Sequence, residues 1–99
     1  MQELINVVIK QPNKPPHRKT IKNTLEAFQK IVGGYIETFP IAVGIIGVVN
    51  EDGIALGLPR NCEFFGHRIY GTLILCGVDG EDFASLPYSI DLDEEGGND

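Results

Sequence analysis

Only one stretch of this sequence has the periodicity of a helix. Four apolar residues fall at spacings that place them on one helical face: Leu25, Phe28, Ile31 and Val32. Asn23 precedes them as an N-cap residue, with Glu26 three positions later in the pattern of a capping box. Gly33-Gly34 supplies a left-handed residue of the kind that ends helices. The sequence therefore predicts a helix over residues 22–33 that packs one face on a sheet.

The other apolar stretches are short, and most of them alternate or are rich in β-branched residues, which is typical of strands. We expect strands at Leu4–Lys10, Tyr35–Phe39, Ile41–Val49, Ile54–Leu58 and Ile69–Gly77. The almost wholly apolar third stretch fits a central strand covered on both faces, or a strand with glycine bends at Gly44 and Gly47. Together these segments predict an α+β fold of order β-α-β-β-β, with one helix packed on a mostly antiparallel sheet.

The segments between the strands contain turn and connector signals. Gln11–Pro16 holds three prolines and is predicted to be a stiff connector. Asn50–Gly53 is typical of a turn, which makes Ile54–Leu58 the second arm of a hairpin. We expect an irregular loop at Pro59–Arg68, and a turn followed by a short helical segment at Asp79–Leu86.

The net charge of −6 is spread unevenly over the 99 residues. Residues 1–30 carry a net charge of +4, and residues 31–99 carry −10. Five acidic residues lie in the last nine positions: Asp91, Asp93, Glu94, Glu95 and Asp99. We therefore expect a single α+β domain over residues 1–88 and an acidic, disordered tail over residues 89–99. Such a tail suits either solubility or an acidic arm that mimics DNA.

Several features predict a protein of a reducing, cytosolic compartment. Met1–Lys10 lacks the basic start and apolar stretch of a secretory signal. The longest apolar run has nine residues, whereas a membrane-spanning helix needs about 20. The two cysteines, Cys62 and Cys76, fit thiols in a reducing compartment. The open edges of the predicted sheet favour pairing with a second copy, so we expect a homo-oligomer.

No motif in the sequence indicates catalysis, a metal or a cofactor. Cys62, His67 and Cys76 lack the pairs of ligands two to four residues apart that zinc sites use. A thiol–imidazole pair of Cys62 and His67 has no orienting motif around it. The carboxylates of Glu51, Asp52 and the segment 79–82 lie at turns, where such residues are favoured for structural reasons.

The strongest functional signal in the residues themselves is a basic stretch on and beside the proline-rich connector. It contains Lys10, Lys14, His17, Arg18, Lys19 and Lys22. A small phosphorylated ligand or an acidic protein face would suit it, and a merely solvated connector explains it equally well. Duplex DNA is disfavoured, because no recognition helix accompanies the stretch and the rest of the chain is acidic.

A set of motifs in a fixed order resembles one known family. The motifs are Val7-Val-Ile-Lys-Gln-Pro12, the segment Asn23–Glu37, Asn50–Gly53, Leu56–Asn61, and Gly71-Thr72 followed by Asp79–Leu86. They resemble a small domain-of-unknown-function family of phages, plasmids and other mobile elements of Firmicutes, over about residues 5–86. The resemblance implies a phage or mobile-element gene expressed in a bacterial cytoplasm, and it carries no catalytic assignment.

In that setting we expect a non-catalytic, counter-defence protein that sequesters a nucleotide-derived signalling molecule. The expected ligand-binding residues are Lys10, Arg18, Lys19, Arg60 and Asn61, with Tyr35, or Phe64 and Phe65, to stack on a base. The alternative is an inhibitor that binds a host defence protein directly, including by acidic DNA mimicry. A third class, an enzyme that degrades such a signal, would use His67, Glu51 or Asp79.

Overall fold

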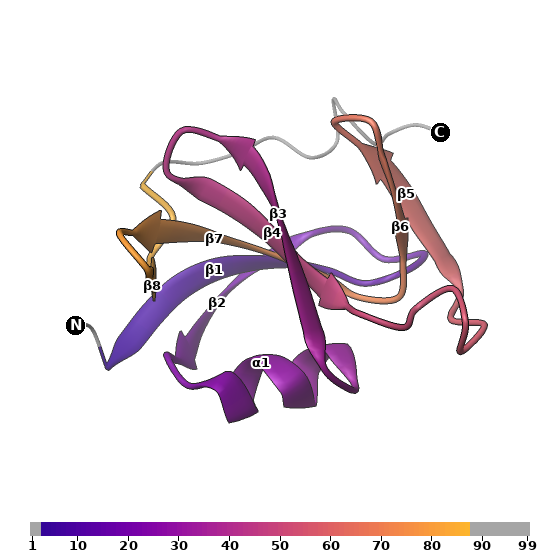
Figure 1. Ribbon diagram of the computed structural model, residues 1–99, viewed down its shortest axis with the longest axis horizontal. Helices are drawn as coiled ribbons and strands as arrows, with labels where there is room; N and C mark the ends of the chain where they lie inside the picture. The colour runs from indigo at the N-terminus through magenta and orange to yellow at the C-terminus, as the bar shows by residue number, and fades with distance from the viewer. Residues whose placement is uncertain (1–2, 88–99) are drawn as a thin grey trace.

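Figure 1 shows the computed structural model of the chain, which describes residues 3–87. The acidic tail predicted for residues 89–99 lies outside the described residues, as does the end of the predicted domain 1–88. The strands are β1 (Leu4–Lys10), β2 (His17–Lys22), β3 (Ile36–Ala42), β4 (Ile45–Asn50), β5 (Arg60–Phe64), β6 (His67–Tyr70), β7 (Leu73–Asp79) and β8 (Asp82–Ala84). The helix α1 covers Leu25–Val32. The predicted α+β class, with one helix on a mostly antiparallel sheet, is confirmed.

The main sheet has the strand order β2-β1-β7-β4-β3, and β8 adds to β7. All of its pairings are antiparallel. Strands β2 and β3 therefore form opposite edges, and each edge carries a feature that opposes pairing with another chain. Arg18, Lys19 and Lys22 lie on β2, and Pro40, which has no N–H to donate, lies in β3 beside a register shift. The homo-oligomer expected from open edges remains a prediction.

Helix α1 is shorter than predicted at its start. Thr24 is the N-cap residue, and its side-chain oxygen accepts a hydrogen bond from the Ala27 backbone N–H at 3.1 Å. Asn23, which the sequence predicts as the N-cap residue, does not cap the helix. Its side-chain amide instead donates to the Phe83 carbonyl oxygen at 2.9 Å. The predicted end of the helix is confirmed, because Gly33 has a left-handed φ of 83°.

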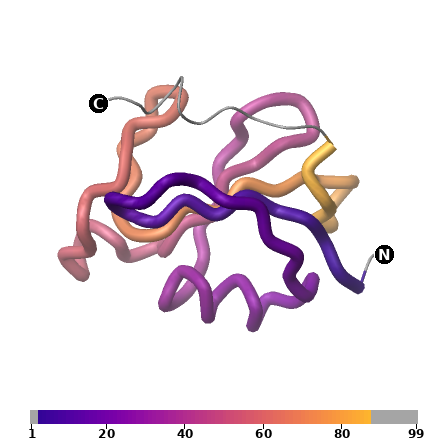
Figure 2. The backbone as a smooth tube through the Cα atoms, turned by 180° about the vertical axis from the view of Figure 1, so that it is seen from behind, coloured from indigo at the N-terminus to yellow at the C-terminus, as the bar shows by residue number. Residues whose placement is uncertain are grey.

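One apolar core lies between α1 and the sheet. Phe28 and Val32 of the helix are buried against the odd-numbered residues of β1 and against the even-numbered residues of β7. The Phe28 ring also contacts the Phe83 ring of β8, with 4.6 Å between the ring centres. Figures 1 and 2 show the helix running across one face of the sheet, as the sequence predicts.

A second core covers the other face of the sheet, where sequence reasoning predicted only an irregular loop at residues 59–68. That prediction is wrong, because the segment forms the β5–β6 hairpin. Phe64 and Ile69 of the hairpin pack on Val8, Leu73 and Leu75 of the sheet. The domain therefore has three layers: helix, main sheet and hairpin (Figure 1).

Three other segments differ from their predictions. The apolar stretch 41–49 is divided by a turn at Gly44, whose φ is 77°, between β3 and β4. Residues 54–58 form a hydrogen-bonded turn instead of a strand. The helical segment predicted after Asp79 is the short strand β8. The order β-α-β-β-β therefore omits β2, the β5–β6 hairpin and β8.

After β8 the chain returns to the centre of the sheet. Strand β7 pairs with β1 only opposite Val8–Lys10. Near Asn6, the backbone groups of β1 that point toward β7 therefore have no partner in that strand. There the Leu86 N–H donates to the Asn6 carbonyl oxygen at 3.0 Å, and the Asn6 N–H donates to Ser85 Oγ at 2.9 Å. Residues 85–86 thus complete the sheet beside β1. Within residues 3–87, no helix has the length and apolar composition needed to cross a membrane.

Candidate anion-binding groove beside β2

A groove with a volume of about 520 Å³ runs between the outer strands and the returning chain. Its lining comes from three segments: Asn6–Val8 of β1, Arg18–Thr20 of β2, and Leu86–Pro87. The return of the chain to β1 therefore creates one wall of the groove. Without residues 86 and 87, the face of β1 and β2 would be open at this point.

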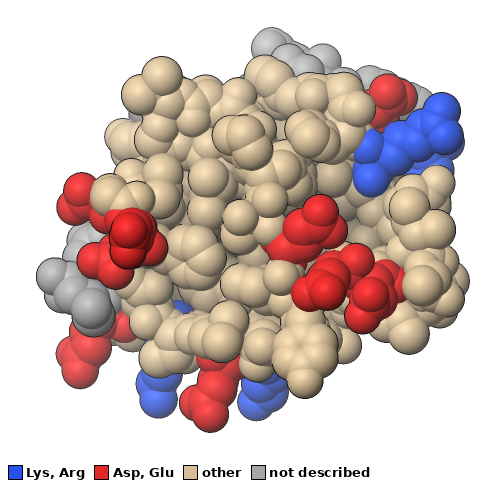
Figure 3. All heavy atoms as spheres, in the orientation of Figure 1, with Lys and Arg blue, Asp and Glu red and all other residues tan. Residues whose placement is uncertain are grey.

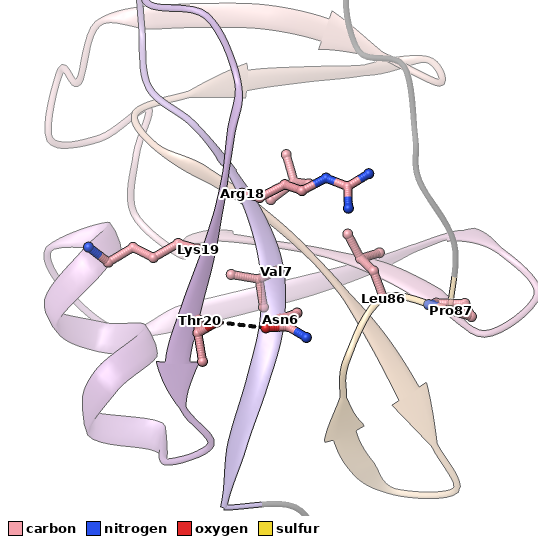
Figure 4. A pocket seen from close by; sticks show the side chains of 8 residues that line it. Asn6, Val7, Arg18, Lys19, Thr20, Leu86 and Pro87 are labelled. Carbon is pink, nitrogen blue, oxygen red and sulfur yellow. Dashed lines mark hydrogen bonds between the residues drawn. The ribbon is translucent and has the colours of Figure 1, made fainter.

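Strand geometry decides which side chains enter the groove. Asn6 pairs with Thr20, and Val8 pairs with Arg18, so these four side chains share one face of the sheet. Figure 4 shows Arg18 extending from β2 toward Leu86, whereas Lys19 leaves the strand in the opposite direction. Lys19 therefore lines the groove with its backbone, and its side chain lies on the other face of the sheet.

The polar groups of the groove favour an anion. Thr20 Oγ1 donates a hydrogen bond to Asn6 Oδ1 at 2.6 Å, which fixes the Asn6 amide with its nitrogen on the side of Leu86 and Pro87 (Figure 4). The Arg18 guanidinium adds a cation on the same face. None of the described residues that line the groove is acidic. The groove therefore offers a cation and an amide donor beside an apolar wall.

The structure brings together only two of the six predicted ligand-binding residues, Arg18 and Lys19, in the lining of this groove. Lys10 and Asn61 contact one another at the far end of β1, where the Lys10 ammonium donates to Asn61 Oδ1 at 3.1 Å. Arg60 is exposed on β5, next to Asn61 in sequence. Tyr35 is 70% exposed and precedes β3, at the sheet edge opposite β2.

Asn61 has a structural role that its sequence context does not indicate. Its side-chain nitrogen donates to the Lys10 carbonyl oxygen at 2.7 Å and to the Gly71 carbonyl oxygen at 2.8 Å. These bonds join the end of β1, strand β5 and the turn before β7. The Lys10 ammonium also forms hydrogen bonds within the fold, because it donates to the Gln11 carbonyl oxygen at 2.9 Å as well as to Asn61.

Sequence reasoning missed five side chains of the groove: Asn6, Val8, Thr20, Leu86 and Pro87. Asn6 carried a signal, since it is a polar residue between the apolar, β-branched residues Ile5 and Val7 of β1. Of the stacking candidates, Phe64 is buried in the hairpin core and Phe65 is 52% exposed in the β5–β6 turn.

The two thiols are held in their protonated form. Burial raises the pKa of Cys62, and the nearby Lys10 and Arg60 lower it by less. Burial raises the pKa of Cys76 to about 12. The His67 ring lies against Phe39, with 4.3 Å between ring centres, and no hydrogen bond joins it to Cys62 within residues 3–87. The geometry therefore does not assemble the thiol–imidazole pair considered from sequence.

Acidic residues gather at the opposite side of the domain. Glu37, Glu51, Asp52, Arg68 and Tyr70 are among the residues that line a recess of about 400 Å³ at the end of β4. Figure 3 shows acidic side chains to the right of the centre of this face, over the end of β4 in Figure 1. In the part of the chain that the structure describes, no three potential ligands are grouped to hold a metal ion.

Comparison with known proteins gives one match. Residues 5–94 match the family described as a domain of unknown function, DUF3846. No curated protein matches the chain, and no solved structure matches it.

Proposed function

Since the chain belongs to the DUF3846 family of domains of unknown function, we propose that it is a non-catalytic binding protein that sequesters a nucleotide-derived signalling molecule in the groove beside β2. The observation that carries this proposal is the convergence of Arg18, Asn6 and Thr20 on one face, against the apolar wall of Leu86 and Pro87. A phosphorylated ligand needs a cation and N–H donors for its phosphate, together with an apolar surface for its base.

The size of the groove fits such a ligand. Its volume of about 520 Å³ lies within the range of about 300–1,000 Å³ that is common for small-molecule pockets. In the proposed pose, phosphate oxygens accept hydrogen bonds from the Arg18 guanidinium. The flat face of the base lies on Leu86 and Pro87, where the Asn6 amide reaches an acceptor on its edge.

The motif resemblance supplies the biological setting of the proposal. The resemblance to a family of phages, plasmids and mobile elements implies that the protein acts in the cytoplasm of a bacterial host. Sequestration of an immune signal would then be a counter-defence activity. A homo-oligomer would fit this role if the subunit contact leaves the groove beside β2 open.

Replacing Arg18 with glutamine is expected to weaken ligand binding at least tenfold. A hydrogen bond to a charged group contributes about 1.5–3 kcal/mol, and about 1.4 kcal/mol corresponds to tenfold in affinity. Isothermal titration calorimetry with cyclic di-AMP, the linear dinucleotide pApA and ADP-ribose measures this loss, after circular dichroism has shown that the variant is folded.

The matched control is Arg60→Gln, because Arg60 is exposed and does not line the groove. This variant should bind the same probe within twofold of the wild type. The proposal fails if the wild-type protein binds none of the three probes, or if Arg18→Gln and Arg60→Gln weaken binding equally. Recovery of a chemically altered probe would instead indicate an enzyme.

A second candidate function, direct inhibition of a host protein, is favoured by the loop after β4. The loop is rigidified by backbone hydrogen bonds, from Leu56 N to Asp52 O at 2.8 Å and from Leu58 N to Gly53 O at 3.0 Å. It exposes Ile54 by 74% and Leu56 by 60% beside acidic residues. Apolar centres with charged rims are typical of protein interfaces, and this one would suit a basic partner.

This second function predicts that the double variant Ile54→Ser, Leu56→Ser loses a stoichiometric host protein that the wild type retains in a pulldown. The control is Val43→Ser, since Val43 is 95% exposed in the turn between β3 and β4. Retention of the same host protein by the double variant would rule out this loop as the contact.

A further inference from the structure

A second recess lies on the opposite face of β2, the face covered in part by α1. Its volume is about 300 Å³. It is lined by Ile9 and Gln11 at the end of β1, His17 and Lys19 of β2, Ile31 of the helix, and Thr72 before β7. As in the groove beside β2, the residues within 3–87 that line this helix-side recess include no acidic one.

The alternation of β2 places two basic side chains in the helix-side recess. His17 and Lys19 pair with Ile9 and Val7, which belong to the core under α1. Their side chains therefore share the helix face of the sheet. Figure 4 shows Lys19 reaching toward the helix, away from Arg18. Because α1 ends at Val32, just after Ile31, the helix does not cover this end of the strand.

The chemistry of the helix-side recess is that of a small oxyanion site. Four side chains from three segments offer hydrogen-bond donors: the Lys19 ammonium, the His17 imidazole, the Gln11 amide and the Thr72 hydroxyl. Within residues 3–87, none of the four takes part in a side-chain hydrogen bond. They differ in this from Lys10 and Asn61, whose polar groups are used to hold β1 and β5 together. Ile9 and Ile31 add an apolar floor.

The two recesses lie on opposite faces of one edge strand and share Lys19 in their linings. Among residues 3–87, no strand pairs with the outer side of β2, so a ligand can pass around it from one face to the other. We propose that the helix-side recess is a second anion subsite, and that the sequestered ligand carries two phosphate groups separated by a ribose, one bound on each face of β2. This inference rests on the proposed function of the groove, and it specifies the class of ligand.

The test compares a probe with one phosphate, AMP, with a probe that carries two, the linear dinucleotide pApA. Calorimetry on the wild-type protein should show pApA binding at least about tenfold more tightly than AMP, because it gains the second subsite. His17→Gln should reduce this preference to threefold or less with AMP affinity kept within twofold, because His17 does not line the groove beside β2. Lys19→Gln should also reduce the preference to threefold or less. Arg18→Gln should weaken both probes.

The control for the two helix-side variants is Lys14→Gln, which removes a cation from the connector outside both linings and should leave the preference for pApA unchanged. The second subsite is overturned if pApA binds no more tightly than AMP, or if the helix-side variants bind pApA as the wild type does. If Arg18→Gln still weakens AMP in that case, the proposed function of the groove stands alone. If neither probe binds the wild type, both proposals fail.

Discussion

Replacing Phe64 with alanine is expected to lower the free energy of unfolding by about 3–5 kcal/mol, the usual cost of emptying a buried aromatic site. Phe64 is 1% exposed and belongs to the core beneath the β5–β6 hairpin. It shares that core with Val8, Leu73 and Leu75 of the main sheet. Because the hairpin has only two strands, it depends on this packing for its stability. Urea denaturation followed by circular dichroism measures the loss.

The neighbouring phenylalanine provides the control for this prediction. Phe65 is 52% exposed in the turn, and its ring contacts Phe64 edge-on with 4.6 Å between ring centres. Phe65→Ala should cost about 1 kcal/mol or less, the value of one aromatic contact. A smaller loss for Phe64→Ala than for Phe65→Ala would show that the hairpin is not docked on the sheet in solution.

Asn61→Ala is expected to destabilise the fold by about 2–4 kcal/mol. The substitution leaves the carbonyl oxygens of Lys10 and Gly71 without their amide donor and removes an acceptor from the Lys10 ammonium. Each part-buried polar group left unpaired costs about 1–3 kcal/mol. Thermal and urea unfolding give the magnitude, with Arg60→Ala as the exposed neighbour that should change stability by about 0.5 kcal/mol or less.

The same variant separates a structural role of Asn61 from the ligand-binding role predicted from sequence. Because its amide is satisfied within the fold, affinity for pApA should change less than twofold once it is expressed per folded molecule. Unchanged stability together with a tenfold loss of affinity would contradict this conclusion and would indicate that Asn61 binds the ligand.

The parts of the fold that sequence predicted correctly depend on local signals. The strand Leu4–Lys10 follows from β-branched alternation, the end of α1 follows from Gly33, and the turn after β4 follows from Asn50–Gly53. The errors arise where distant residues decide the structure. The stretch 41–49 is apolar on both sides of Gly44, so its hydrophobicity is the same for one long strand and for two arms of a hairpin.

The hairpin β5–β6 was missed because its pattern is weak. Only Phe64 and Ile69 are fully buried in it, and the intervening segment has charged residues and a turn at Phe65-Gly66 that resemble a loop. Strand β8 was missed for another reason: its acidic start resembles a helix N-terminus. Pairing with β7 and the contact between Phe83 and Phe28 override that local preference.

Two of the eight described residues that line the candidate site, Arg18 and Lys19, were within reach of sequence. The basic stretch pointed to Arg18 and Lys19, but the alternation that sends them to opposite faces required knowing that residues 17–22 form a strand. The wall formed by Leu86 and Pro87 was not predictable, because it depends on a contact across most of the chain. Tyr35 was chosen for its aromatic ring alone, and the sheet order places it at the far edge.

The return of the chain to β1 also bears on how the protein is made. The Asn6 N–H donates its hydrogen bond to Ser85 Oγ across a sequence separation of 79 residues, so this part of the sheet is incomplete until residues 85–87 have left the ribosome. Until then β1 presents unpaired backbone groups on one side, and the groove has no second wall. A chain still in synthesis is therefore exposed to wrong strand pairing and lacks one wall of the groove, and both conditions end when residues 85–87 reach β1.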